Sequence, residues 1–268
     1  MTTQSETLYL ELLKHIGEIK EFTKNVQTHP TQFSFTNINH TCYEEMYLKK
    51  QTEIISKNEF YNPITDLKAE CSRCWAFYLR QRNNSIRILD IQLGKKFQGV
   101  LTKYLNTKLS NGSMCVDADT ENKKYPDLKI VKNGKNLAYL ELKYQSAPFV
   151  FAFKQEGKKR ECYEGSAALD LKKLKQQWEL RESGQLKEPI YYVFWLDFPC
   201  VKGVFFMTLE EMWEYYNADA AVFKRKERTG DFTTTATGKK LTAEINKIHP
   251  SIYQMHSFEE LAGILNNY

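Results

Sequence analysis

Long hydrophobic runs are missing from this sequence. No segment approaches the roughly 18 consecutive apolar residues that a membrane-spanning helix needs. The first residues, MTTQSETLYLELL, also lack the positively charged stretch followed by an apolar one that marks a secretory signal peptide. We therefore expect a cytoplasmic protein that makes no contact with membranes. In that reducing compartment the six cysteines are expected to be free thiols.

Internal repeats and low-complexity tracts are absent as well, and no charge of one sign dominates. The 268 residues are 42% hydrophobic and 13% aromatic, which supplies a sizeable core and argues against wholesale disorder. Lysine and arginine total 38 against 33 acidic residues, a formal net charge of +5. This mild excess permits a nucleic-acid partner without requiring one, because the placement of the charges matters more than their sum.

The pattern of apolar residues changes along the chain from helical to β and back. Helical spacing predicts helices over 6–24, 43–58, 66–82, 93–109, 167–180 and 209–216, and a short closing helix from Phe258. Short apolar runs predict strands over 113–119, 126–132, 136–145, 191–198 and 203–208. The run YYVFWLDF is almost continuously apolar, as is typical of a strand buried on both faces. The order indicates an α/β sheet domain with a helical N-terminal third.

The segment KKYPDLKIVKNGKNLAYLELKYQ (123–145) predicts a β-hairpin around Asn133-Gly134. A two-residue loop would place Leu128 on the same face as Glu141, which is a poor match. A three-residue loop, 132–134, would instead pair 131 with 135 and 127 with 139. The apolar side chains of both strands then share one face, and Asp127, Glu141 and Lys143 share the other. We predict the three-residue loop, since a slip by one residue moves every side chain to the opposite face.

Two carboxylates and an ammonium group would then meet on an otherwise apolar sheet. Carboxylates brought close together repel each other and are costly to bury unless a cation lies between them. A hard divalent metal ion with oxygen ligands and several waters suits this geometry. Lys143 could orient a metal-bound water or stabilise negative charge that develops on a phosphate. This pattern favours hydrolysis of a phosphodiester, whereas the alternative is a surface hairpin in which Glu141 and Lys143 form an ordinary ion pair.

The sequence Pro126-Asp127, thirteen further residues and then Glu141-Leu142-Lys143 resembles the PD-(D/E)xK nuclease motif. The resemblance covers roughly residues 90–215. It implies a restriction-endonuclease-like fold, a mixed central sheet flanked by helices, with Mg²⁺ bound by Asp127, Glu141 and the backbone carbonyl of Leu142. Lys143 would act on the attacking water. We expect residues 89–217 to form this nuclease core, 1–88 a helical region packed on it, and 218–268 a basic arm with a short helix.

One position departs from the family pattern, and further residues are candidates for accessory roles at the site. Where the family often has an acid on the preceding helix, this chain has Gln98, so Gln98 and Gln145 are accessory candidates. Asp119 and Glu121 are the alternative sources of the missing acid.

Zinc is a further candidate cofactor. Cys71 and Cys74, with His40 and Cys42, have chemically suitable side chains but lack the spacing of known zinc modules. We favour two small buried side chains at Cys71 and Cys74.

Basic residues close to the motif are candidates for contacts with DNA phosphates. They follow the hairpin, lie on the next helix and recur near the end of the chain. They are Lys154, Lys158, Lys159, Arg160, Lys172, Lys173, Lys175, Lys224, Arg225 and Lys226, with Gln176 beside them. The alternative interpretation is a set of solvated surface charges.

Together these patterns predict a Mg²⁺-dependent endonuclease that cuts double-stranded DNA. The most specific form of the prediction is a type II restriction enzyme acting as a homodimer, because two-fold symmetry matches a palindromic site. The first alternative is a repair or recombination nuclease of the same fold that recognises DNA shape. The second is a DNA-binding protein whose catalytic site has decayed.

Overall fold

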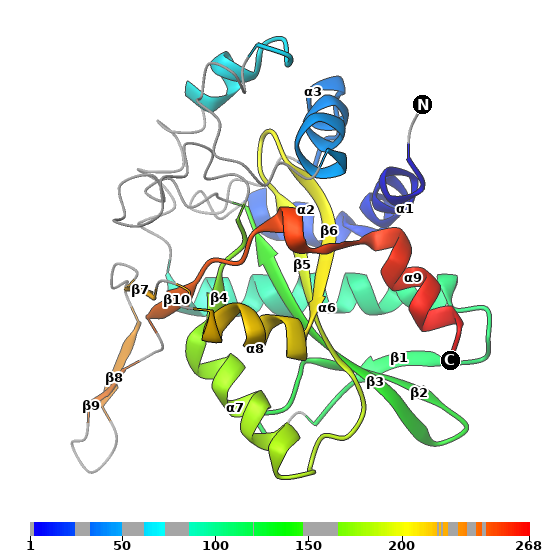
Figure 1. The fold of residues 1–268 in the computed structure, drawn as a ribbon, viewed down its shortest axis with the longest axis vertical. Coiled ribbons are helices and arrows are strands. Elements are labelled where there is room, and N and C mark those ends of the chain that lie inside the picture. Colours follow the sequence, from blue (N-terminus) through cyan, green and yellow to red (C-terminus); the bar gives the residue numbers. More distant parts are fainter. Residues whose placement is uncertain are drawn as a thin grey trace.

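A six-stranded mixed sheet forms the centre of the molecule in a computed structural model of the chain (Figure 1). The structure describes residues 3–24, 33–49, 62–72, 86–119, 121–146, 166–218, 220, 222–224, 230–234, 240–242 and 245–268. The strands in spatial order are β1 (Met114–Asp117), β2 (Leu128–Lys132), β3 (Lys135–Gln145), β5 (Ile190–Asp197), β6 (Lys202–Thr208) and β11 (His256–Ser257). Neighbours are antiparallel except β3 and β5, which are parallel.

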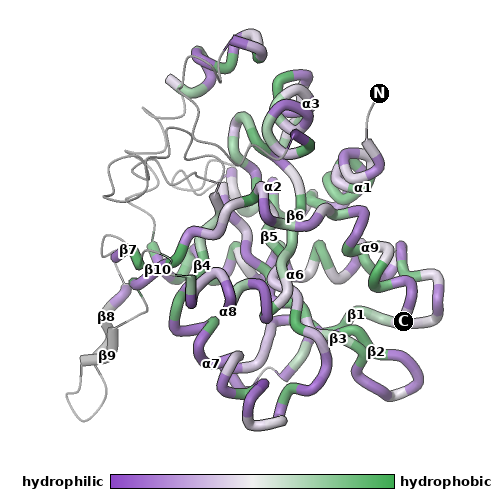
Figure 2. Tube along the Cα trace, in the orientation of Figure 1, coloured by the Kyte–Doolittle hydropathy of each residue, from purple (hydrophilic) through white to green (hydrophobic). Residues whose placement is uncertain are grey.

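Helices cover both faces of this sheet. One face packs against α1 (Gln4–Leu12), η1 (Leu13–His15), α2 (Gly17–Lys24), α6 (Arg87–Lys108) and α9 (Phe258–Asn266). The other face packs against α3 (Asn37–Cys42), η2 (Tyr43–Leu48), α7 (Leu171–Glu182) and α8 (Leu209–Asn217). Hydrophobic residues gather on the central strands, whereas turns and outer helix faces are hydrophilic (Figure 2). No described helix combines the length and the hydropathy needed to cross a membrane.

Short strands border the core near the C-terminal end. The pairs run β4 (Leu169–Asp170) to β10 (Asn246–Ile248) to β7 (Phe223–Lys224), and β8 (Phe232–Thr234) to β9 (Lys240–Thr242). A 3₁₀ turn, η6 (Ile252–Gln254), then leads to β11, which lies at the edge of the central sheet. The last part of the chain therefore packs against the core through β10, β11 and α9.

The sheet confirms the predicted fold class, a mixed α/β fold with helices on both faces. The parallel pair β3 and β5 is joined through α7, as a parallel connection requires a crossover rather than a hairpin. Every residue of β5 is buried, so the apolar run was correctly interpreted as a strand covered on both sides. The predicted order of helix, three-stranded meander, helix and strand is present in α6, β1 to β3, α7 and β5.

Two expectations about helices are wrong in detail. Residues 6–24 do not form one helix, because a 3₁₀ turn at Leu13–His15 separates α1 from α2. The segment just before the helix expected over 43–58, where no helix was predicted, contains α3, whose start is fixed by a reciprocal cap between Thr36 and Asn39. The expected helices over 43–58 and 66–82 extend beyond the described residues, within which η2 and helical residues 67–72 are seen.

The β2–β3 hairpin has a two-residue loop, so the predicted three-residue loop is wrong. Lys132 pairs with Lys135 across Asn133 and Gly134, whose φ angles of 52° and 75° are those of a type I′ turn. The register then shifts, and Ile130 pairs with Ala138, which leaves Leu137 as the extra residue of a β-bulge on β3. The bulge restores the predicted faces, because it moves the later residues of β3 by one position relative to the turn.

A buried ion pair joins the last residue of β5 to the first residue of β6, beside the turn of this hairpin. Asp197 and Lys202 are almost fully buried, and their oxygen and nitrogen lie 2.5 Å apart. We expect Lys202→Met to lower the free energy of unfolding by about 3–5 kcal/mol, since a buried carboxylate loses its counter-charge. Urea denaturation would measure the loss. Replacing both residues by leucine should recover most of it, and a single variant within 1 kcal/mol of the wild type would contradict this role.

Candidate active site

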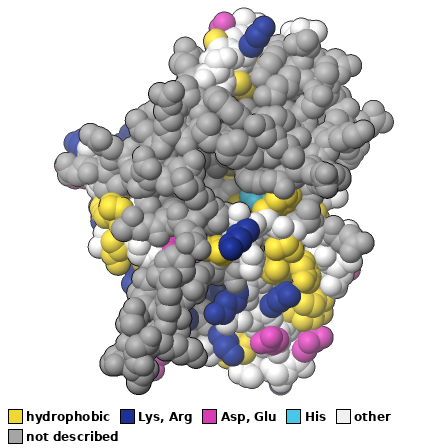
Figure 3. Space-filling model, turned by 90° about the vertical axis from the view of Figure 1, so that its left-hand side faces the viewer, with side chains coloured by type: hydrophobic (Ala, Val, Ile, Leu, Met, Phe, Trp, Pro, Cys, Tyr) yellow, Lys and Arg dark blue, Asp and Glu magenta, His cyan; other side chains and the backbone are white. Residues whose placement is uncertain are grey.

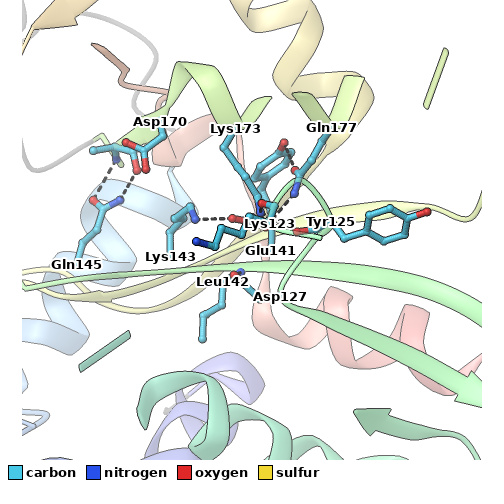
Figure 4. A network of polar contacts seen from close by, with 12 residues as sticks. Lys123, Tyr125, Asp127, Glu141, Leu142, Lys143, Gln145, Asp170, Lys173 and Gln177 are labelled. Carbon is cyan, nitrogen blue, oxygen red and sulfur yellow. Dashed lines mark hydrogen bonds and ion pairs between the residues drawn. The ribbon is translucent and has the colours of Figure 1, made fainter. Parts of the chain in front are cut away.

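The three residues of the predicted motif lie together where β2 begins (Figure 4). Asp127 directly precedes β2, and Glu141 and Lys143 lie on the part of β3 that runs past the start of β2. On its other side β3 pairs with β5, and helix α7 covers this end of the strand. The sheet thus has a local edge beside Asp127, where polar groups can be reached without breaking the pairing of strands.

Glu141 is held by three polar groups although only 1% of its side chain is exposed. Its Oε1 lies 2.5 Å from the Lys143 ammonium, and its Oε2 lies 3.3 Å from the Lys173 ammonium and accepts a hydrogen bond of 2.9 Å from Gln177. Burial raises the pKa of this carboxyl, but the two lysines outweigh burial and leave the pKa below its usual value. Glu141 is therefore an ionised buried carboxylate.

The pKa of Asp127 is shifted in the opposite direction to that of Glu141. Its Oδ2 accepts a hydrogen bond of 3.0 Å from the backbone N–H of Leu142. Burial and the nearby negative charge of Glu141 raise its pKa to about 6, against the lowering influence of Lys143, Lys173 and the Leu142 N–H. Two neighbouring buried carboxylates, one with a raised and one with a lowered pKa, are typical of a metal-binding or catalytic site.

The backbone of Leu142 offers a further oxygen on the same edge. Tyr139 N–H donates to Pro189 O, which places the polar backbone groups of odd-numbered β3 residues on the β5 side. The N–H and C=O of Leu142 therefore point to the β2 side, since both groups of a residue in a strand point to the same edge. That N–H reaches Asp127, so the Leu142 carbonyl lies beyond the end of β2 and is not used by its ladder.

These oxygens fit a hard divalent cation. Within the described ranges no group of three His, Cys, Asp or Glu residues is placed to hold a metal ion. Mg²⁺, however, keeps several waters and is commonly bound by only one or two carboxylates. Asp127 and Glu141, with the Leu142 carbonyl, offer oxygen donors of that kind on one edge of the sheet.

Lys143 is a charged group in this environment. Burial lowers the pKa of its ammonium, but Glu141 and Asp127 outweigh burial and raise it above the usual value. A protonated lysine donates hydrogen bonds and cannot accept a proton. Lys143 is thus suited to orienting a water or stabilising negative charge. Glu141 and Lys143 do form the ion pair of the alternative interpretation, but the pair is largely buried and does not lie on an exposed surface of the hairpin.

The two accessory candidates have different positions. Gln98, on α6, donates hydrogen bonds to Asp117 Oδ1 at 2.9 Å and to the Asp127 carbonyl at 3.3 Å, so it lies at the site. Gln145 instead exchanges two hydrogen bonds with the backbone of Ala168, which fastens β3 to the segment before α7. Gln145 is therefore a structural residue.

Of the two acids proposed as alternatives to Gln98, Asp119 lines the same pocket as Gln98 and Asp127. Asp119 Oδ1 caps a turn by accepting from the backbone N–H groups of Glu121 and Asn122, at 3.0 and 3.1 Å. Glu121 is exposed. The acid that Gln98 does bring to the site is Asp117, which sequence reasoning did not identify.

A pocket of about 430 Å³ opens beside Asp127. Basic, amide and carboxyl side chains line it together with an aromatic ring; they include Lys95, Gln98, Asp117, Lys123, Tyr125 and Lys173. Of the three cations, Lys95 and Lys123 are exposed and suit a phosphate group of a substrate.

Helix α7 supplies two residues that were missed or misplaced from the sequence. Lys173 was expected among lysines facing DNA, but its ammonium is directed at Glu141. Gln177 is fully buried and accepts a hydrogen bond from the Tyr192 hydroxyl while donating to Glu141. The available signal was Gln177 itself, a polar residue on the same helical stripe as Leu174 and Leu180.

Most of the predicted DNA-binding residues cannot be placed. Lys154, Lys158, Lys159, Arg160, Arg225 and Lys226 lie outside the described residues. Lys172 and Lys224 are exposed, and Lys175 lies 5.2 Å from the ring of Tyr216. Figure 3, viewed from the side where β7 and β10 lie in Figure 1, shows lysine and arginine side chains gathered on the described part of that face.

The zinc candidates are only partly described. Cys42 and Cys71 are buried and form no disulfide with each other, and Cys74 lies outside the described residues. The Nδ1 atom of His40 lies 2.7 Å from Glu6, so the ring is engaged in another contact. The described residues provide no support for a zinc site.

Comparisons with known proteins give little further information. No protein-family model and no curated protein matches the chain. Among solved structures the chain is similar to Archaeoglobus fulgidus Hjc, a Holliday junction resolvase from an archaeal hyperthermophile, with 14% identity and a TM-score of 0.33. The alignment covers 63% of this chain and 95% of that chain. A similarity this low carries no inference about function, which therefore depends on the geometry of the site.

Proposed function

We propose that this chain is a metal-dependent endonuclease that hydrolyses phosphodiester bonds in DNA. The observation that carries the proposal is the juxtaposition of ionised Glu141 with Asp127, whose pKa is raised to about 6, beside the charged Lys143. Such an arrangement costs stability in the absence of a cation. A sheet edge built only for stability would place apolar or singly charged residues here, so the electrostatic strain supports a catalytic role.

In this proposal the ion would be held by Asp127, Glu141 and the carbonyl of Leu142. When bound, Mg²⁺ would supply Lewis-acid stabilisation of the phosphate and lower the pKa of a coordinated water. The protein's own groups orient the reactants. The Lys143 ammonium donates to the attacking water or to the developing negative charge on the phosphate, and Lys95 and Lys123 lie in the adjacent pocket where phosphate oxygens would be bound.

DNA as the substrate is supported by the chemistry of the site and by the exposed cations near it. The narrower predictions, a type II restriction enzyme and a homodimer, stay predictions, because most of the candidate DNA-contacting residues lie outside the described ranges. A structure-selective nuclease would use the same catalytic residues. The interpretation as a decayed site is disfavoured by the retention of both carboxylates and both ammonium groups around them.

A cleavage assay on two substrates tests the proposal. We expect the purified chain to cut DNA in Mg²⁺ and to leave it intact in EDTA. Supercoiled plasmid cut into discrete fragments would indicate sequence-specific cleavage, and cutting of a synthetic four-way junction but not of the matching linear duplex would indicate structure selectivity. Failure to cut either substrate with Mg²⁺ or Mn²⁺, by protein shown to be folded, would contradict the proposed function.

A further inference from the structure

The Lys173 ammonium makes two hydrogen bonds and one ion pair within the protein. It donates to the backbone carbonyl oxygens of Lys123 at 3.0 Å and Tyr125 at 2.7 Å, and it lies 3.3 Å from Glu141 Oε2 (Figure 4). Two of its three N–H donors are thus used by backbone carbonyls, and the ammonium is also paired with Glu141. Its side chain is only 18% exposed. Lys173 is therefore poorly placed to bind a DNA phosphate, although Lys172 and Lys175 on the same helix are exposed.

These contacts join the two segments that carry the carboxylates. Residues 123–125 lead directly through Pro126 into Asp127, whereas Glu141 belongs to β3. Lys173 fastens the first segment and the second carboxylate to one helical turn of α7. Gln177, four residues later on the same helix face, binds the same Oε2 atom and is itself held by Tyr192. The helix thus sets where the Asp127 segment lies relative to Glu141.

We propose that Lys173 is a positioning residue that sets the distance between the two metal-binding carboxylates. This inference rests on the proposed function, because it assigns a role within the same metal site. It predicts the direction in which metal affinity changes when Lys173 is replaced. As a charge alone, an ammonium so close to a metal ligand repels the metal, and removing it should tighten metal binding. As a positioning residue, its removal should loosen the Asp127 segment and weaken metal binding.

Isothermal titration calorimetry with Ca²⁺ distinguishes these two roles on folded, full-length protein. We expect Lys173→Met to weaken Ca²⁺ binding by about 10-fold or more, as is usual when a group that orients metal ligands is removed. Lys175→Met is the matched control, because Lys175 lies on the same helix but contacts the ring of Tyr216. We expect its Ca²⁺ affinity to equal that of the wild type.

Cleavage kinetics separate positioning from direct catalysis. If Lys173 acts through the geometry of the metal site, saturating Mg²⁺ should return the kcat of Lys173→Met to within a few-fold of the wild type, with a raised Mg²⁺ requirement. A kcat that stays low at saturating Mg²⁺, with unchanged Ca²⁺ affinity, would show a catalytic role and overturn the inference. Equal or tighter Ca²⁺ binding by the variant would also overturn it.

Failure of the inference differs from failure of the proposed function. Wild-type protein that binds no Ca²⁺ and cuts no DNA removes the proposed metal site itself. If the wild type and the Lys173 variant bind Ca²⁺ with equal affinity, only the positioning role is contradicted. If circular dichroism shows that Lys173→Met is unfolded, Lys173→Arg replaces it. A planar guanidinium cannot reproduce the three contacts, so we expect weakened Ca²⁺ binding, and unchanged binding would contradict the inference.

Discussion

Glu141→Gln is expected to remove Mg²⁺-dependent cleavage and to destabilise the metal-free protein by about 3 kcal/mol. The carboxylate is buried between the ammonium groups of Lys143 and Lys173 and balances their charge. A neutral amide keeps the shape but leaves two positive charges close together with little access to water. Because the same residue would bind the metal ion, we expect cleavage to fall by at least about 1,000-fold, the range seen when a main electrostatic group of an active site is lost.

Chemical denaturation in EDTA and the cleavage assay in Mg²⁺ measure the two effects on the same preparation. Glu182→Gln is the control, because Glu182 is an exposed acid at the end of α7. We expect its stability to change by less than about 0.5 kcal/mol and its cleavage rate to be that of the wild type. A Glu141→Gln protein that is as stable as the wild type, or that still cuts DNA, would be incompatible with the buried charge cluster described above.

Asp127→Asn is expected to abolish cleavage in the same way but to stabilise the metal-free protein. Ionised Asp127 is penalised by burial and by Glu141, which raise its pKa to about 6. Asparagine removes the charge and keeps an oxygen that can accept from the Leu142 N–H. A pKa raised by about two units corresponds to about 1–3 kcal/mol gained at pH 7. Thermal denaturation in EDTA would measure the gain, and a variant less stable than the wild type would contradict the assignment.

The pH dependence of the wild type follows from the same raised pKa. A carboxyl whose folded-state pKa lies above the unfolded value contributes stability that is present at low pH and is lost as pH rises through the folded pKa. Metal-free protein should therefore gain stability from Asp127 as pH falls from 7 towards about 4.5. Glu141, with its lowered pKa, opposes this only at lower pH. Stabilisation by added Mg²⁺ should show the reverse trend and grow between pH 5.5 and 7.5, since the ion needs ionised ligands.

The faces of the hairpin could be predicted from the sequence, but the way the chain achieves them could not. Alternating apolar residues on β2 and β3 required Leu128 and Leu140 to share a face, and this is what the structure shows. Two chain geometries satisfy that requirement: a longer loop, or a tight turn followed by a bulge. Asn133-Gly134 is well suited to the tight turn, and the cost of the extra residue falls on Leu137. The pattern of apolar residues alone does not distinguish these solutions.

The contribution of α7 to the site could not be predicted from the sequence, for a different reason. Lys173 and Gln177 lie more than thirty residues after Glu141, and nothing local in their sequence specifies which strand the helix covers. Lys173 lies among other lysines and glutamines on α7, and such a composition is typical of a solvent-exposed helix face. Only the crossover from β3 to β5 places that turn of the helix over Glu141. Asp117 was missed likewise, because its link to Asp127 runs through Gln98.

A crystal of the wild-type protein soaked in Mn²⁺, with an anomalous difference map, tests the central claim most directly. We expect a single strong peak bridging the carboxylate oxygens of Asp127 and Glu141, within coordination distance of the Leu142 carbonyl, and no such peak in Asp127→Asn crystals. An ion bound elsewhere, or an empty site in protein that cuts DNA with Mn²⁺, would contradict it.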